Sequence, residues 1–124
     1  MTPFKLKQTI AADDGIQAVM TLDSQSVIYQ AHFPGHPVTP GACLIQTVSD
    51  LMELHHNRKL SIREMKNVRF LSAIIPGDND EIVFDIRCTY LTDANNQNTD
   101  AEILCKATVS KKGALCAKMS LVFY

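Results

Sequence analysis

The stretch AHFPGHPVTPGACLIQ, residues 31–46, gathers three prolines and two glycines around two histidines and then continues into a helical pattern. A loop rich in proline loses few conformations on folding, so a side chain mounted on it is oriented at little entropic cost. His32 is the side chain that this loop would hold. Imidazole is well suited to exchange a proton near neutral pH. The stretch therefore predicts a rigid loop that presents a proton-transfer group beside the start of a helix.

The helix is predicted to run from Pro40 to about Asn57. Its apolar side chains recur at the spacing of one helical face, which is typical of a helix packed on a core. The positions that carry this pattern are Leu44, Val48, Leu51 and His55, with Ile45, Met52 and Leu54 beside them.

Thr39 is the expected N-cap of this helix, with Pro40 at the first helical position, where its missing N–H is not needed. The backbone N–H groups of Gly41 and Ala42 would then be free at the positive end of the helix dipole. A base next to such groups indicates proton abstraction alpha to a thioester or similar acyl group. A histidine in a turn of this kind is also typical of a packed structural residue, so both interpretations of His32 stay open at this point.

The remainder of the chain reads mainly as strands. A hairpin is predicted from two segments around the turn AADDG, and a further short strand is predicted at residues 26–33. Four more β-rich segments follow the helix, and the polar segment at 92–100 is predicted to be a loop. Strands around one long helix indicate an α+β fold, and residues 1–124 are expected to form one domain. The hairpin segments are 4–10 and 15–22, and the later segments are 63–74, 81–91, 101–111 and 114–124.

Composition excludes several classes of function. The formal net charge is −1, from 12 basic and 13 acidic residues, so no basic stripe favours nucleic acid or an anionic membrane. No apolar run is long enough to span a bilayer, and the N-terminus lacks the pattern of a signal peptide, so a cytoplasmic location is expected. The four cysteines are far apart without metal-ligand spacing, which predicts buried small side chains and no metal site.

The segment HFPGHPVTPGACLIQ resembles the signature of the 3-hydroxyacyl-acyl carrier protein dehydratases of fatty acid synthesis, the FabZ and FabA group. NVRFLSAIIPGD, residues 67–78, and the closing segment, residues 105–124, also resemble this family, so the likeness covers most of the chain. The fold that it implies is the hotdog fold, in which a curved antiparallel β-sheet wraps a long central helix. It also implies dimers that join their sheets, with an acyl tunnel at the dimer interface.

The resemblance implies a role for each matched residue. His32 becomes the base that removes the alpha proton, and the N–H of Gly41 binds the thioester carbonyl. The backbone carbonyl of Val38 orients the His32 ring, and Phe33 belongs to the substrate-binding residues. Similar enzymes hold the peptide bond between His32 and Phe33 in the cis form, so the same bond is expected to be unusual here.

The sequence departs from the family pattern at Gln46, where the family has a Glu or Asp that the partner subunit contributes. An amide cannot donate a proton as a carboxylic acid does, and such assistance is worth a factor of about 100 to 10,000. Three explanations stay open. Gln46 holds the hydroxyl or a water while His32 moves the proton alone, Asp50 reaches in from one turn along the helix, or the chain has lost the chemistry. Both side chains could also belong to a polar, solvent-facing stripe.

The resulting hypothesis is a dehydratase that converts (3R)-hydroxyacyl groups on acyl carrier protein to trans-2-enoyl products, in fatty acid or polyene-type lipid synthesis. No metal or diffusible cofactor is expected, because the acyl group arrives on the carrier's phosphopantetheine arm. Expected assemblies are a homodimer or a heterodimer with a related hotdog subunit, or a higher oligomer. The alternatives are a catalytically impaired acyl-carrier-binding or heterodimer subunit and a hotdog acyl thioesterase. Candidate contacts for the acidic carrier are Arg69, Lys111 and Lys112.

Overall fold

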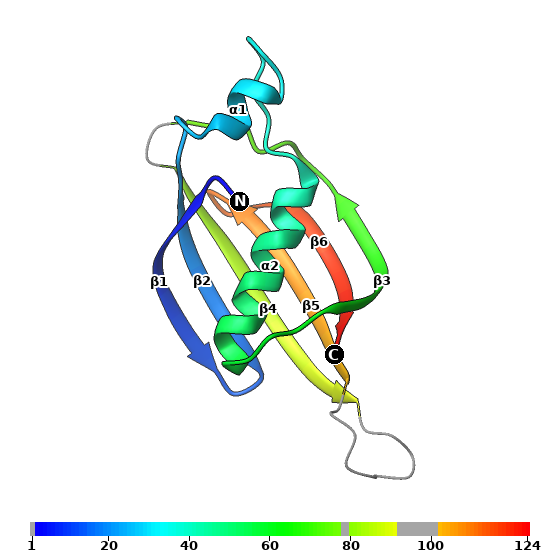
Figure 1. Ribbon diagram of the computed structural model, residues 1–124. Helices are drawn as coiled ribbons and strands as arrows, with labels where there is room; N and C mark the ends of the chain where they lie inside the picture. The colour runs from blue at the N-terminus through cyan, green and yellow to red at the C-terminus, as the bar shows by residue number, and fades with distance from the viewer. Residues whose placement is uncertain (1, 78–79, 92–101) are drawn as a thin grey trace.

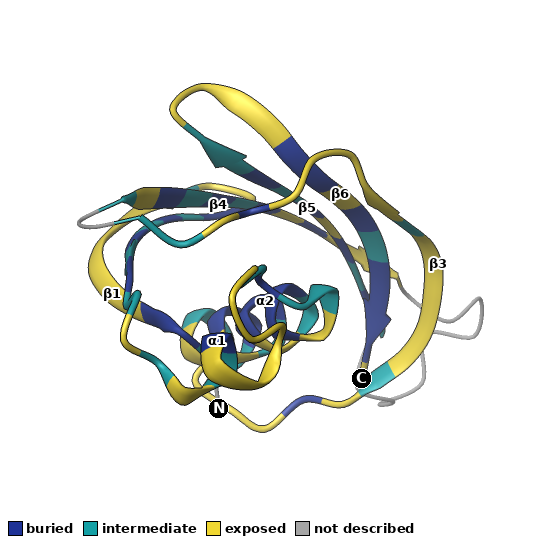
Figure 2. Ribbon diagram, turned by 90° about the horizontal axis from the view of Figure 1, so that it is seen from above, coloured by how far each residue is buried: buried dark blue, intermediate teal, exposed yellow. Residues whose placement is uncertain are grey.

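The computed structural model describes residues 2–77, 80–91 and 102–124. Its strands form one six-stranded antiparallel sheet in the order β1-β2-β4-β5-β6-β3. The sheet curves around α2, which lies against its concave face (Figures 1 and 2). The predicted α+β class and the hotdog arrangement are confirmed. The elements are β1 Phe4–Ala12, β2 Gly15–Leu22, α1 Val27–Ala31, α2 Gly41–His56, β3 Ile62–Phe70, β4 Glu81–Leu91, β5 Glu102–Lys111 and β6 Ala114–Phe123.

The core lies between α2 and the concave face of the sheet. Alternate residues of β4, β5 and β6 point inward and are buried, because successive side chains of a strand point to opposite faces. α2 contributes the buried stripe that its sequence period predicts. Its buried members are Cys43, Leu44, Thr47, Val48, Leu51 and Met52.

α2 begins and ends within one residue of its predicted limits. It ends at Asn57, which has φ 51° in the left-handed region and donates its N–H to Glu53 O. Asn is among the few residues that adopt this conformation readily, which is why it stops a helix here. The predicted hairpin of β1 and β2 is present, and the four later strands all lie within the predicted segments or one residue beyond them. The loop predicted at 92–100 lies outside the described residues.

The strand predicted just before the loop is wrong, because Val27–Ala31 form the short helix α1. Ser26 Oγ accepts a hydrogen bond from the N–H of Ile28 at 3.4 Å and so caps the first turn. Tyr29 is buried from this helix, and its hydroxyl is bound to another segment of the chain. The apolar, β-branched residues of this run favour a strand locally, but the cap and the burial of Tyr29 decide for a helical turn.

β3 forms one edge of the sheet and pairs only with β6. Most of its residues are exposed, and apolar Met65 and Phe70 are among them. An edge strand offers unpaired backbone groups to another chain unless something covers it. Within the described part of this chain, nothing pairs with that edge.

Candidate active site

The loop between α1 and α2 lies at one end of the molecule (Figure 1), and His32 is its first residue after α1. His32 terminates α1, and its N–H donates to Ile28 O at 2.9 Å. Three further backbone bonds tie the loop to itself. The N–H of Phe33 donates to His36 O at 3.3 Å, that of His36 to Phe33 O at 2.8 Å, and that of Val38 to His32 O at 2.8 Å. The peptide bond between His32 and Phe33 is cis, as the resemblance implied. The loop thus holds an exposed imidazole on a closely bonded backbone.

Thr39 anchors this loop to the rest of the fold. Its hydroxyl is hydrogen-bonded to the hydroxyl of buried Tyr29 at 2.7 Å, and its N–H donates to Ile74 O at 2.9 Å. Burial raises the pKa of the Tyr29 hydroxyl, so this group stays protonated and needs a partner. The prediction that Thr39 is the N-cap of α2 is therefore wrong. Its side chain is engaged by Tyr29, ten residues earlier in the chain, and Pro40 occupies the N-cap position instead.

The start of α2 is left without a side-chain cap. Pro40 makes no capping hydrogen bond, and the first turn contains no acidic residue. Cys43 N–H donates to Pro40 O at 3.0 Å, whereas the N–H groups of Gly41 and Ala42 have no partner among the described residues. Free N–H groups at the positive end of a helix dipole form a site for an anionic or strongly polarised oxygen. The predicted free N–H groups of Gly41 and Ala42 are therefore present, and their role toward a carbonyl stays a prediction.

A largely apolar pocket of about 360 Å³ lies beside this helix start. Val38 forms one side of it, and the end of β3 with the segment after it forms the other. The residues that line it include Val38, Gly41, Leu44, Phe70, Leu71 and Ile74. A second hollow, of about 400 Å³, adjoins it and shares Val38 and Ala73. The two hollows therefore offer apolar surface beside the uncapped helix start.

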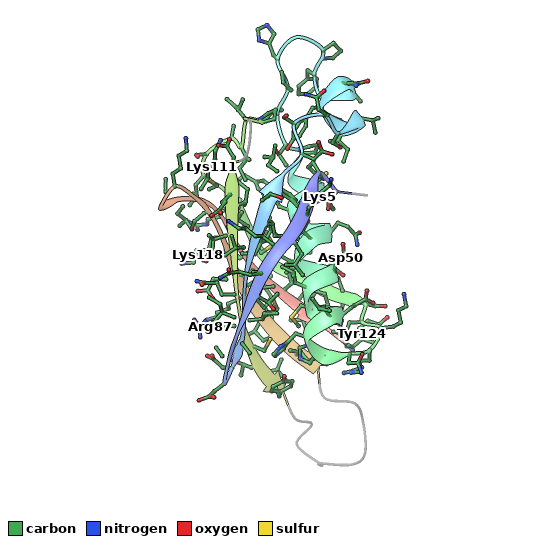
Figure 3. The ribbon with its side chains drawn as sticks, turned by 90° about the vertical axis from the view of Figure 1, so that its left-hand side faces the viewer. Lys5, Asp50, Arg87, Lys111, Lys118 and Tyr124 are labelled. Atoms are coloured by element: carbon green, nitrogen blue, oxygen red, sulfur yellow. The ribbon has the colours of Figure 1, made fainter. Side chains whose placement is uncertain are left out.

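Gln46 and Asp50 lie on the other side of α2, where both are exposed. Gln46 Nε2 donates a hydrogen bond to Asp50 Oδ1 at 2.8 Å. Figure 3 shows Asp50 on the side of α2 that faces away from the sheet. The structure therefore brings Gln46 and Asp50 together with each other, and it turns both outward, away from the core of their own chain.

The other predicted contacts are placed as follows. Phe33 is 59% exposed and stacks in a tilted arrangement on the His32 ring, with ring centres 5.4 Å apart. Lys111 is engaged within the chain, because its Nζ lies 2.9 Å from Asp80 Oδ2 and donates to Ile75 O at 3.0 Å. Arg69 and Lys112 are exposed. Orientation of the His32 ring by the Val38 carbonyl stays a prediction.

The cysteines are free and buried, as predicted. Burial raises the pKa of Cys88 to about 11 and that of Cys105 to about 12, which leaves both as unreactive thiols at neutral pH. Within residues 2–77, 80–91 and 102–124, no cluster of His, Cys, Asp and Glu is arranged to hold a metal ion. The helices of that same part of the chain are all too short or too polar to cross a membrane.

Two contacts of this region were not anticipated from the sequence. Phe70 and Tyr29 both contact the loop or the helix start from distant positions in the chain. The inward direction of Phe70 follows from its spacing of two from Val68, which packs on the core. The contact partners themselves have no sequence signal, because they depend on where β3 and α1 cross α2.

The sequence that forms this loop, helix start and pocket was compared with models of known protein families. The ApeI-like family model, described as ApeI dehydratase, matches residues 7–107. The chain belongs to the ApeI-like dehydratase family. This assignment confirms the likeness to FabZ-type hotdog dehydratases that the loop motif implied.

Individual relatives agree with this assignment. The 3-hydroxyacyl-acyl-carrier-protein dehydratase FabZ of Wolbachia pipientis wMel is 27% identical over 133 aligned residues, which cover 97% of this chain and 86% of the relative. The FabZ of Koribacter versatilis is 28% identical over 125 residues, covering 94% and 72%.

Solved structures confirm the fold. The dehydratase heterocomplex ApeI:P from Xenorhabdus doucetiae superposes with a TM-score of 0.76 at 16% identity, covering 99% of this chain and 98% of that one. A hypothetical thioesterase from Streptococcus pneumoniae, solved with coenzyme A, gives a TM-score of 0.59 at 12% identity, covering 98% and 86%. At these identities the structural likeness concerns the fold alone.

Proposed function

We propose that this protein eliminates water from (3R)-hydroxyacyl groups carried on acyl carrier protein and releases trans-2-enoyl thioesters, in fatty acid or polyene-type lipid synthesis. The observation that carries the proposal is the uncapped start of α2, with its free N–H groups at Gly41 and Ala42, at the end of the loop that holds His32. The family assignment supports the same class of reaction.

The chemistry follows from these groups. The thioester carbonyl accepts hydrogen bonds from the N–H of Gly41, which stabilises the negative charge that develops on its oxygen. His32 removes the proton from C2, and the electron pair of that C–H bond forms the C2–C3 double bond. The C3–O bond breaks, and the hydroxyl leaves with a proton as water. Val38 and Phe33 belong to the same loop as His32 and lie beside this base.

We infer that Gln46 acts without being an acid. An ionised carboxylate only accepts hydrogen bonds, so the contact with Asp50 requires the Nε2 end of the Gln46 amide to point at Asp50. In a dimer, Oε1 is then free on the other side to accept the O–H of a substrate hydroxyl that is bound beside the His32 of the other subunit. That bond turns a lone pair of the hydroxyl oxygen toward His32, which returns the proton it took from C2. One histidine then serves as base and acid.

This positioning role of Asp50 is testable through Gln46 itself. Asp50→Ala is expected to lower kcat up to about tenfold with little change in KM, because an exposed hydrogen bond contributes about 0.5–1.5 kcal/mol. Asp50→Asn is the matched control: it keeps the size but can pair with either end of the amide. The ¹⁵N-labelled side-chain amide of Gln46 should shift in both variants. An unchanged amide signal and unchanged kcat in Asp50→Ala would remove Asp50 from the site.

We further propose that the working unit is a dimer, either of this chain or with a related hotdog subunit, or a higher oligomer built from such dimers. The unpaired edge of β3 and the outward direction of Gln46 support this proposal, because each leaves polar groups that a second subunit can pair with. The acyl group arrives on the phosphopantetheine arm of the carrier, and no further cofactor takes part. Arg69 and Lys112 are the exposed cations proposed for the acidic carrier. The cytoplasmic location stays a prediction.

A second candidate is a subunit that binds acyl carrier protein without turnover, paired with an active partner. Gln46 favours it, because the proton-donating acid of the resembling dehydratases is absent at this position. A thioesterase is the third candidate and needs a carboxylate to activate water. Asp50 is the nearby acid on α2, and its bond to Gln46 competes with that task.

The deciding experiment is turnover of a (3R)-hydroxyacyl carrier protein by the purified protein, followed as enoyl formation and as free thiol release. Enoyl formation that disappears in His32→Ala supports the dehydratase. An inert wild type with an active Gln46→Glu variant identifies a scaffold that has lost its chemistry. Thiol release without enoyl product identifies a thioesterase.

A further inference from the structure

The ring of Phe70 packs directly against the start of α2. A Cβ built on Gly41 would lie 2.4 Å from Phe70 Cζ and 2.7 Å from its Cε2, closer than real side chains approach each other. Only the absence of a side chain at position 41 lets the ring come this close. The side of the helix start that faces β3 is therefore closed by an aromatic ring.

The position of Phe70 is held by the sheet. Phe70 is the last residue of β3 and pairs with Ala117 of β6. Immediately after it, the N–H groups of Leu71 and Ser72 both donate to Cys116 O, at 2.8 and 3.2 Å. The backbone is therefore fixed to β6 on both sides of Phe70, and the ring can leave Gly41 only by rotating about its own side-chain bonds.

Core packing does not account for this ring. Phe70 is 53% exposed and lies outside the buried core. Val68, two residues earlier on the same face of β3, packs against the core. A large aromatic side chain that is half exposed yet in contact with a backbone glycine suits a binding wall better than a core position. It forms one wall of the pocket of about 360 Å³.

We propose that Phe70 is a specificity-determining residue that restricts this site to unbranched acyl groups. The inference rests on the proposed function, because it places the thioester carbonyl at the N–H of Gly41. The carbons next to that carbonyl then lie beside the ring, with Leu44 and Leu71 on the other walls of the pocket. In this placement a methyl branch at C4 points against the ring, whereas a straight chain passes along it. One methylene in an apolar pocket changes selectivity about 10–200-fold.

The test compares Phe70→Ala with wild type on two pantetheine thioesters, 3-hydroxyhexanoyl and its 4-methyl-branched counterpart. Wild type should prefer the straight chain at least tenfold in kcat/KM, and Phe70→Ala should reduce that ratio about tenfold, mainly by gaining activity on the branched substrate. Ile10→Ala is the control, since Ile10 is an equally exposed apolar residue on β1, at the opposite edge of the sheet. An unchanged ratio in Phe70→Ala overturns the proposal.

A binding measurement separates this proposal from the proposed reaction. Amide analogues of the two thioesters, which cannot lose the pantetheine group, are titrated into both proteins by calorimetry. A straight-to-branched affinity ratio that falls in Phe70→Ala supports the role of Phe70 even where wild type turns over neither thioester. Equal ratios in the two proteins, or no binding of either analogue, would overturn it.

Discussion

The two ends of α2 differ in how their backbone groups are capped. At the C-terminal end, Glu53 O accepts the N–H groups of Asn57 and Arg58, and Glu53 Oε2 accepts the N–H of Leu60 at 2.9 Å. His56 Nδ1 donates to Met52 O at 2.8 Å, while its Nε2 is hydrogen-bonded to the Tyr90 hydroxyl. These groups at the C-terminal end are therefore used within the fold.

The N-terminal end has none of this. Pro40 provides no side-chain cap, and the hydroxyl of Thr39 is hydrogen-bonded to that of Tyr29. The N–H groups of Gly41 and Ala42 have no partner among the described residues. A helix end without partners is unusual in a folded protein unless water or a ligand supplies them. The contrast separates an end that stabilises the fold from an end whose free N–H groups we propose as the place for the substrate carbonyl.

The largest expected effect separates the histidines at the two ends. His32→Ala should reduce enoyl formation by about 100- to 10,000-fold, the usual contribution of a proton-transfer group. Its stability should change by less than about 0.5 kcal/mol, because His32 is exposed. His56→Ala is the matched control and should lose stability while it keeps its activity. Activities are measured as turnover and stabilities by urea unfolding. Equal activities of the two variants would contradict the division of roles.

The next effect comes from capping the free end. In Pro40→Asp, the new carboxylate can accept the N–H of Ala42, and it also repels the charge that develops on a thioester oxygen. Relative to Pro40→Ala, this variant should gain about 0.5–2 kcal/mol in the free energy of unfolding. Activity should fall about tenfold in the same comparison. A gain in stability without any loss of activity would show that the substrate does not use this helix end.

Much of this arrangement follows from local sequence, and some of it does not. The period of α2, the Asn57 stop, the paired strands and the His32 loop were predictable, because each depends on residues close together in the chain. α1 and the capping of α2 were not, since the partner of Thr39 is Tyr29, a tertiary contact. The contact between Phe70 and Gly41 likewise depends on how β3 crosses the helix. Residue roles taken from the family resemblance stay predictions.

The contribution of the hydrogen bond between the Thr39 and Tyr29 hydroxyls to stability can be measured directly. Thr39→Val leaves the buried Tyr29 hydroxyl without its partner and should cost about 1–3 kcal/mol in the free energy of unfolding. Tyr29→Phe should also destabilise, whereas the double variant should lose less than the sum, because no polar group is then left unpaired. Chemical denaturation of the four proteins gives the coupling energy. Strict additivity would show that the two hydroxyls do not interact.

The smallest effect concerns the C-terminal end. Asn57→Ala places a side chain with no local hydrogen bond in the left-handed region and should cost about 1 kcal/mol. Asn57→Gly should be close to neutral, because glycine adopts this conformation freely. Both should keep full turnover, as measured in parallel with thermal unfolding. A loss of activity in Asn57→Ala would connect this end of the helix to the site.

The most direct test of the account follows the amide signals at both ends of α2 by NMR while a 3-hydroxyacyl pantetheine amide is added to ¹⁵N-labelled protein. The account predicts downfield shifts of the Gly41 and Ala42 amide protons, with Asn57 and Arg58 unchanged. If the analogue binds while Gly41 and Ala42 keep their positions, the uncapped start of α2 is not where the acyl carbonyl is held.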